Sequence, residues 1–222
     1  ERAFRWLKAK AKSDDFRANE LMNIARDARD IEQYELASKV YDFMIHSKPS
    51  MVQGGWLNQA LIEQLGVLDR LDEKKAAMLT SEFDGSQCGN CFGWELAREE
   101  YKIKQQTIDS TLTADYKEIM SSLRARYPRP LSEGLTYKSY ASVLQIAGRF
   151  DEALIEFARA ETLLGDSKEG DESRLARAMC AFYDGDIDWA KTQLEVLLKS
   201  TSKEIANDAL ENALLIAANS VE

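Results

Sequence analysis

The feature that most constrains this sequence is a helix–turn–helix pattern that returns with small residues and a glycine at matching places. In the stretch beginning at Gly134, apolar residues recur at helical spacing up to Gly148 and again beyond it. The stretch beginning at Asp171 repeats this pattern around Gly185. A glycine suits such a turn because it adopts a left-handed backbone without a Cβ penalty. Repeated helix pairs bury their apolar faces by stacking on one another, so the pattern predicts an array of helices.

The core positions of these two stretches follow from the shared spacing. In the Gly134 stretch they are Tyr137, Tyr140, Ala141 and Leu144 in the first helix and Phe150, Ala153, Phe157 and Ala160 in the second. In the Asp171 stretch they are Ala178, Ala181, Ile187, Ala190, Leu194 and Leu197. Gly185 follows Gly148 by 37 residues, more than the 34 of a regular repeat. We expect the polar segment 165–173 to absorb the difference as a loop.

The same arrangement begins at Ala18. Its core positions are Leu21, Ile24 and Ala25 in the first helix and Tyr34, Ala37, Tyr41 and Met44 in the second, with Pro49 closing the unit. Small side chains at Ala25 and Ala37 allow the two helix backbones to approach closely. All three stretches resemble the tetratricopeptide repeat, a helix–turn–helix unit of 34 residues. This resemblance implies an all-α, right-handed superhelical solenoid of antiparallel helix pairs.

Applied to the whole chain, the pattern predicts a single helical repeat domain over 1–222. Its parts are a partial unit at 1–17, a repeat at 18–51, degenerate helix pairs at 52–90 and 91–130, repeats at 134–167 and 171–204, and a capping helix at 205–222. The final helix carries one apolar stripe of Ile205, Ala209, Ala213 and Ile216. The chain starts at Glu1 without an initiator Met, and residues 1–12 form one short amphipathic stretch. We therefore expect that stretch to complete a repeat whose first half was removed.

The composition supports a helical array. Three prolines and eleven glycines are few for a strand-rich fold with many tight turns. The chain has 38 acidic and 29 basic side chains and a net charge of −9, which argues against binding to a nucleic-acid backbone. No stretch approaches the roughly 20 apolar residues of a membrane-spanning helix. The excess charge lies in residues 150–222. It favours either solvated outer helix faces or an electrostatic funnel for a basic partner segment.

Two cysteines, Cys88 and Cys91, form a C-x-x-C sequence before a predicted helix. This setting can lower a thiol pKa and assist disulfide exchange, so the pair is a redox candidate. A structural or incidental pair and a metal site are the alternatives. A zinc site needs four ligands, and the other soft ligands, Cys180 and His46, are far away in the sequence. We expect no bound metal and no cofactor.

Catalysis is not expected from this sequence. It contains no nucleophile elbow, phosphate-binding loop or H-E-x-x-H string. Its single histidine, His46, lies near the end of a predicted helix, with no acidic or nucleophilic partner in the same frame. The sequence therefore predicts a protein that is not an enzyme.

The resemblance to the tetratricopeptide repeat implies that the first helix of each repeat lines a concave groove. The candidate groove residues are Met22, Arg26, Arg29, Lys138, Gln145, Leu175, Met179, Phe182 and Tyr183. Family members that grip a peptide carboxylate use Lys and Asn at two of these positions; Lys138 fits the first, whereas Ser142 departs from the second. Apolar anchors are therefore the expected mode of binding. Alternatively, the apolar candidates near Met179 pack beneath the capping helix, and the two arginines are ordinary solvated residues.

The predicted function is a non-catalytic protein–protein interaction or scaffold module that binds a peptide or protein segment in its groove. Two alternatives stay open. The chain is a redox-responsive or disulfide-containing helical module that uses Cys88 and Cys91, or it is a structural spacer that associates with itself.

Overall fold

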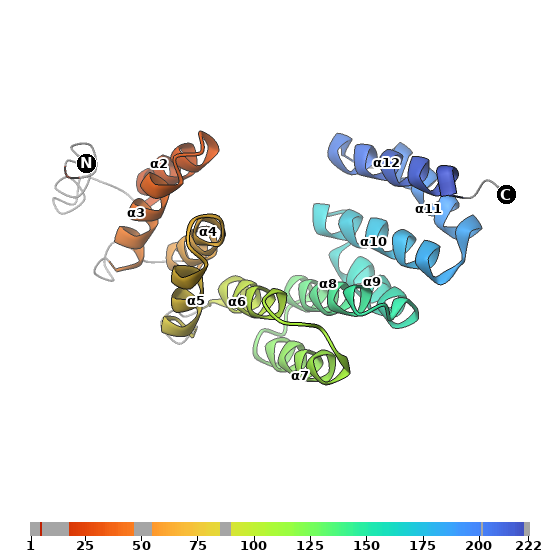
Figure 1. Cartoon of the computed structure of the whole chain (residues 1–222), viewed down its shortest axis with the longest axis horizontal. Helices are drawn as coiled ribbons and strands as arrows, with labels where there is room; N and C mark the ends of the chain where they lie inside the picture. The colour runs from red at the N-terminus through yellow and green to blue at the C-terminus, as the bar shows by residue number, and fades with distance from the viewer. Residues whose placement is uncertain (1–4, 6–17, 47–54, 85–89, 201, 220–222) are drawn as a thin grey trace. The chain divides into compact units, whose positions relative to one another are not determined.

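The computed structural model describes residue 5 and residues 18–46, 55–84, 90–200 and 202–219. The partial unit expected at 1–17 lies outside this part of the chain apart from Arg5, and so does Pro49. Throughout the described residues the regular secondary structure is helical, without a strand (Figure 1). The chain divides into two compact units, Glu1–Gln105 and Gln106–Glu222. The all-α class predicted from the sequence is therefore confirmed.

The first unit contains five helices in its described residues. They are α2 (Ala18–Asp30), α3 (Tyr34–Ile45), α4 (Trp56–Leu71), α5 (Glu73–Glu82) and α6 (Phe92–Lys104). Helices α2, α3, α4 and α5 pack in succession, and α4 also contacts α2 and α6. The sequence predicted a break in the helix near 68–71. The break falls at Asp72, whose side chain caps α5 by accepting a hydrogen bond from the backbone N–H of Lys75 at 3.2 Å.

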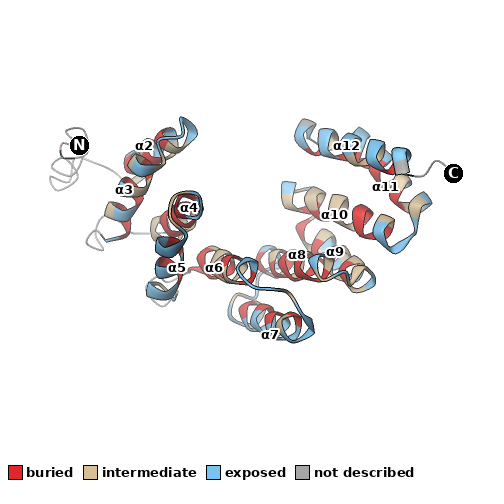
Figure 2. Ribbon diagram, in the orientation of Figure 1, coloured by how far each residue is buried: buried red, intermediate tan, exposed pale blue. Residues whose placement is uncertain are grey.

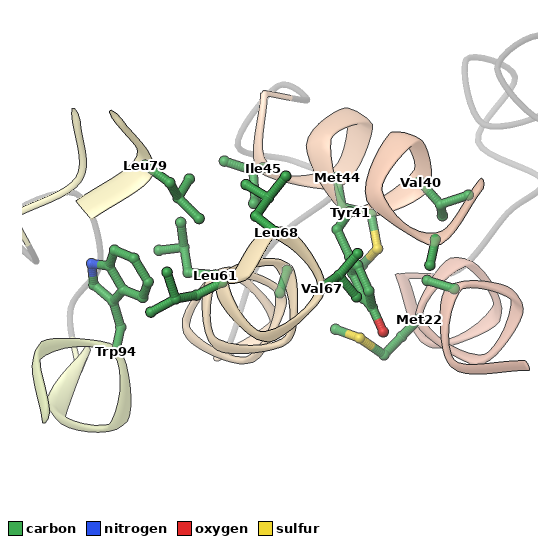
Figure 3. Packing of buried hydrophobic residues seen from close by; sticks show 14 of the residues in the cluster. Met22, Val40, Tyr41, Met44, Ile45, Leu61, Val67, Leu68, Leu79 and Trp94 are labelled. Atoms are coloured by element: carbon green, nitrogen blue, oxygen red, sulfur yellow. The ribbon is translucent and has the colours of Figure 1, made fainter. Parts of the chain in front are cut away.

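The core of the first unit lies between these helices. Ala25 and Ala37 are completely buried where α2 meets α3, as their small size predicted. Tyr41 and Met22 lie together in the core near Val67 of α4 (Figure 3). The indole of Trp94 is completely buried, and its Nε1 donates to the carbonyl oxygen of Phe83 at 2.9 Å. Buried aromatic residues of this size are a large part of the apolar surface that holds such a small unit together.

The second unit contains six helices in its described residues. They are α7 (Ser110–Arg126), α8 (Pro130–Ile146), α9 (Phe150–Leu164), α10 (Lys168–Asp184), α11 (Ile187–Ser200) and α12 (Lys203–Asn219). Neighbouring helices along the chain pack on one another, and α10 also contacts α8 and α12. Gly148 and Gly185 have φ angles of 72° and 97°, so both turn glycines adopt the left-handed backbone expected from the sequence.

One boundary in the second unit was predicted wrongly. Segment 165–173 is not a polar loop, because α10 already begins at Lys168. The Ser167 hydroxyl caps this helix by accepting from the backbone N–H of Gly170 at 3.1 Å. Acidic residues in the first turn, where carboxylates favour the helix dipole, add to the cap. The extra residues therefore lengthen a helix.

The helices have one buried side and one exposed side (Figure 2). On α12, the predicted stripe is confirmed at Ile205, Ala209 and Ile216, which are buried, and Ala213 packs against them. The opposite side of α12 exposes Leu210 and Leu214. Within the described residues, no helix combines the length and the apolar character that crossing a membrane requires.

Candidate functional site

Helices α8, α10 and α12 of the second unit share a common register. Each carries one completely buried alanine, namely Ala141, Ala178 and Ala209. A completely buried alanine marks the place where a helix backbone approaches its neighbours most closely. Because side chains follow the helix with a fixed period, residues at the same distance from these alanines face corresponding directions.

A row of exposed apolar side chains follows from this register. The residues five positions beyond the three alanines are Ile146, Tyr183 and Leu214, and their exposed fractions are 69%, 52% and 62%. We call these three residues the apolar row. Single exposed apolar residues are ordinary on a protein surface, but equivalent ones on three alternate helices form a pattern and make this row the candidate surface.

Aromatic packing holds the middle of the apolar row in place. The ring of Tyr183 stacks on Phe150 at the start of α9, with 5.3 Å between the ring centroids and 27° between the planes. It also lies against Phe182 at 5.4 Å. A ring fixed by two aromatic neighbours loses little further conformational freedom when a partner covers it.

Other predicted apolar groove residues are less open. Met179 is buried, and Leu175 and Phe182 are half-buried. All three belong to the cluster that contains Ile205 and Ala209 of α12. These residues therefore pack into a cluster to which α12 contributes, as the alternative raised by the sequence predicted. Tyr183 is the predicted apolar candidate that stays open to solvent.

The polar groove candidates of the second unit link its helices. Lys138 of α8 forms an ion pair with Glu172 of α10. The next pair of alternate helices is linked in the same way: Lys168 of α10 pairs with Glu204 of α12 at 2.9 Å. The Lys138 ammonium is thus already matched by a carboxylate of the protein. Gln145 is half-buried on the same helix as Lys138.

The candidates of the first unit have structural partners. Met22 is completely buried and is not accessible to a ligand. Arg26 and Arg29 converge on Glu63 of α4. The Arg26 Nε donates to the Glu63 Oε1 at 2.9 Å, and the Arg29 Nη1 donates to its Oε2 at 3.3 Å. Arg29 also pairs with Asp30 at 3.0 Å. Neither arginine is simply a solvated residue.

Glu63 is the centre of this cluster, and no sequence motif marks it. The Tyr41 hydroxyl donates to its Oε2 at 2.6 Å and the Gln59 amide to its Oε1 at 2.8 Å. Burial alone would raise the pKa of the Glu63 carboxyl, but hydrogen bonds from Arg26, Tyr41 and Gln59 outweigh this and lower it. Burial and the neighbouring carboxylate raise the pKa of Tyr41, so its phenol keeps the proton that it donates. The cluster joins α2, α3 and α4.

The cysteines have different states. Cys91 is disulfide-bonded and completely buried, whereas Cys180 is a free, buried thiol. Cys88 lies outside the described residues. Burial raises the pKa of Cys180 to about 12, which keeps it in the unreactive thiol form. Among the residues that the structure describes, no three His, Cys, Asp or Glu side chains gather as metal ligands would.

His46 has two acidic partners, whereas none was expected from the sequence; one of them, Asp42, is only four residues earlier in the chain. Its Nδ1 lies 3.3 Å from the Asp42 Oδ1, one turn back on α3, and its Nε2 lies 3.4 Å from the Glu82 Oε1 at the end of α5. The ring also meets Phe83 edge-on at 5.9 Å. Glu82 reaches the His46 ring because of the way the helices pack, which no spacing along the sequence reveals.

The sequence matches no protein-family model and no curated protein.

Proposed function

We propose that this chain is a tetratricopeptide-like, right-handed helical solenoid that binds a protein or peptide segment without catalysis. The proposed contact surface is the apolar row together with the aromatic residues that support it. The observation that carries the proposal is the equal placement of Ile146, Tyr183 and Leu214 relative to three completely buried alanines. The recurring helix pairs and their left-handed glycine turns support the assignment to this class of repeat.

The apolar row offers enough contact for a modest affinity. Burying a side chain such as Ile or Leu completely contributes about 1.5–3 kcal/mol. Tyrosine is enriched among the residues that contribute most to protein–protein interfaces. Anchors spaced along alternate helices suit an extended or helical partner segment, which presents its own apolar side chains at regular intervals.

The proposal is tested by selecting binding peptides from a displayed random library and comparing variants. We expect Tyr183→Ala combined with Leu214→Ala to weaken the selected peptides at least tenfold, with unchanged helicity by circular dichroism. Ile155→Ala is the matched control, because Ile155 of α9 is 56% exposed but lies off the apolar row. Equal weakening by the control, or none by the row variant, would contradict the proposed surface.

The disulfide at Cys91 favours a second candidate, the redox-responsive module. In that case a reductant changes the binding of the same peptides to the native chain. The change disappears in the Cys91→Ser variant. Binding that is identical with and without reductant removes this candidate.

The third candidate, a self-associating spacer, predicts that the row variant lowers the molar mass measured by light scattering at high concentration.

A further inference from the structure

The first unit contains a groove that the proposed function does not use. It is a cavity of about 460 Å³ whose walls are α3 and α5 and whose floor is α4. This volume lies within the range of small-ligand sites. The groove belongs to another unit than the apolar row, and the inference below does not depend on the proposed function.

The walls of the groove run in the same direction. Side-chain contacts pair Tyr41 with Glu63, Ser38 with Gln64, and Tyr34 with Arg70. Residue numbers on α4 rise as those on α3 fall, so the two helices are antiparallel. After the single residue Asp72, α5 lines the cavity from Lys75 to Glu82, beside the part of α3 that lines it from Ser38 to His46. The carboxyl ends of α3 and α5 meet where His46 lies 3.4 Å from Glu82.

The two ends of the groove carry opposite charge. Lys39 and Lys75 line the cavity and lie seven residues before His46 and Glu82, which are the residues that meet at the other end. Seven residues are about two turns or about 10 Å of helix. Both lysines therefore start from the same end, and the Lys75 ammonium lies beside Asp72 at the start of α5. Asp42, which is one turn beyond Lys39, and Glu82 stand on either side of His46, toward the opposite end.

The charge at the lysine end is incompletely matched. Lys75 forms an exposed ion pair with Asp72 at 3.4 Å. For Lys39, no carboxylate of the described residues lies within ion-pair distance. An anionic group of a ligand can therefore approach both ammonium groups with little competition from the protein.

The middle of the groove combines an apolar lining with one unsatisfied amide. Leu68, Leu79 and Met78 supply the apolar lining, and Met78 is among the exposed large side chains. The Gln64 side chain is 4% exposed; its Nε2 donates to the Ser38 hydroxyl at 3.1 Å, while its Oε1 has no partner among the described residues. If the amide is turned over, an N–H is left without a partner instead. In either orientation this end of the amide is buried, so it belongs to the packing beneath the groove and is not offered to a ligand.

We propose that this groove binds a short peptide with free termini, about three residues long. Its carboxylate lies beside Lys39 and Lys75, and its ammonium approaches the Asp42 and Glu82 carboxylates that flank the His46 ring. An extended peptide covers about 3.3 Å per residue, so three residues match the length between the charged ends. The central side chain lies on Leu68, Leu79 and Met78, where a flexible methionine adapts to its shape.

The single histidine of the chain makes the first measurement direct. The peptide Ala-Leu-Ala is titrated into the native protein while the imidazole proton signal of His46 is followed by NMR. We expect a saturable shift, because the ligand ammonium approaches the carboxylates that flank the ring. Acetylating the amino end or amidating the carboxyl end should each weaken binding at least tenfold. An unmoved signal up to millimolar peptide, or equal binding of the blocked peptides, overturns the proposal.

A matched pair of lysine variants gives the second measurement. Lys39→Met should weaken binding of Ala-Leu-Ala at least tenfold, with unchanged helicity. Lys74→Met removes an exposed ammonium from α5 outside the groove and should bind like the native chain. Equal affinity for all three proteins overturns the placement of the carboxylate. Because the blocked peptides are tested on the native protein, the proposal remains testable even if the Lys39 variant does not fold.

Discussion

At the scale of single residues, the most consequential group is a carboxylate that the sequence did not mark. Glu63 lies within an apolar helix and is 8% exposed, yet it accepts hydrogen bonds from α2, α3 and its own helix. A buried carboxylate is stable only when its lone pairs are matched. Arg26 and Arg29, which the repeat pattern assigned to a binding groove, supply part of that match. Their positions were predicted, but their contacts were not.

We expect Glu63→Gln to destabilise the first unit by about 1–3 kcal/mol, because it leaves buried donors without their acceptor. Urea denaturation of the whole chain, followed by circular dichroism, measures the change. Glu35→Gln, an exposed change on α3, serves as the control and should alter the free energy of unfolding by less than about 0.5 kcal/mol. If the two variants are equally stable, the cluster contributes nothing measurable.

His46 gives the first unit a dependence on pH. Partial burial lowers the pKa of the ring, but hydrogen bonds and charge from Asp42 and Glu82 outweigh it, and the pKa is raised above its ordinary value. A group whose pKa is raised by folding stabilises the fold below its unfolded pKa, here about 6.5, and this stability is lost as pH rises through the folded pKa. The ring is about half exposed, so the effect stays below about 1 kcal/mol.

The expected result is therefore a small fall in the urea midpoint as pH rises from about 6 to about 8. The groups that face the ring are Asp42 on its own helix, and Glu82 and Phe83 at the end of α5. His46→Gln should remove this slope and leave the rest of the pH profile unchanged. A slope that persists in the variant assigns the dependence to other groups.

At the scale of helices, the starts of α8 and α10 show how local chemistry overrode a regular repeat. The repeat frame placed these starts at Gly134 and Asp171, but the helices begin at Pro130 and Lys168. Proline is favoured in the first turn because its missing N–H has no partner there. Gly134 then lies inside α8, where an added Cβ would come within 2.7 Å of Leu164. Glycine permits the longer helix to pass its neighbour.

Gly170 tests this explanation. A Cβ at this position would lie 2.1 Å from the backbone oxygen of Gly165, which cannot move aside as a flexible side chain can. We expect Gly170→Ala to destabilise the second unit by about 1–3 kcal/mol through overpacking. Gly66→Ala provides the contrast, since Gly66 is exposed in α4 with no atom within 4 Å of the added Cβ. It should stabilise the first unit by about 0.5–1 kcal/mol. Thermal unfolding of both variants distinguishes the effects, and destabilisation of equal size would refute the steric explanation.

At the scale of the whole chain, the sequence divides into two compact units, and the boundary falls between Gln105 and Gln106. Each has its own buried residues, and each is longer than the roughly 40 residues below which a core usually needs disulfides or metals. The helix pair expected at 91–130 is divided between them, with α6 in the first unit and α7 in the second. A periodic pattern does not show where packing becomes sparse along the chain.

We expect the fragments 1–105 and 106–222 to fold separately. The sum of their circular dichroism spectra should match the spectrum of the whole chain, and each should unfold cooperatively in urea. Fragments that are unfolded alone but become helical when mixed would show that the two units depend on each other.

The sequence by itself determined the helical class, most helix positions and the small residues at helix crossings, because all of these depend on the spacing of neighbouring side chains. It also placed Tyr183 on the face of α10 that stays open. Only the tertiary structure decided that Arg26 and Arg29 meet Glu63, that Glu82 reaches His46, and that Met179 and Phe182 pack with α12. These contacts join residues of different helices. Such partners depend on how helices pack, which a periodicity along one chain does not encode.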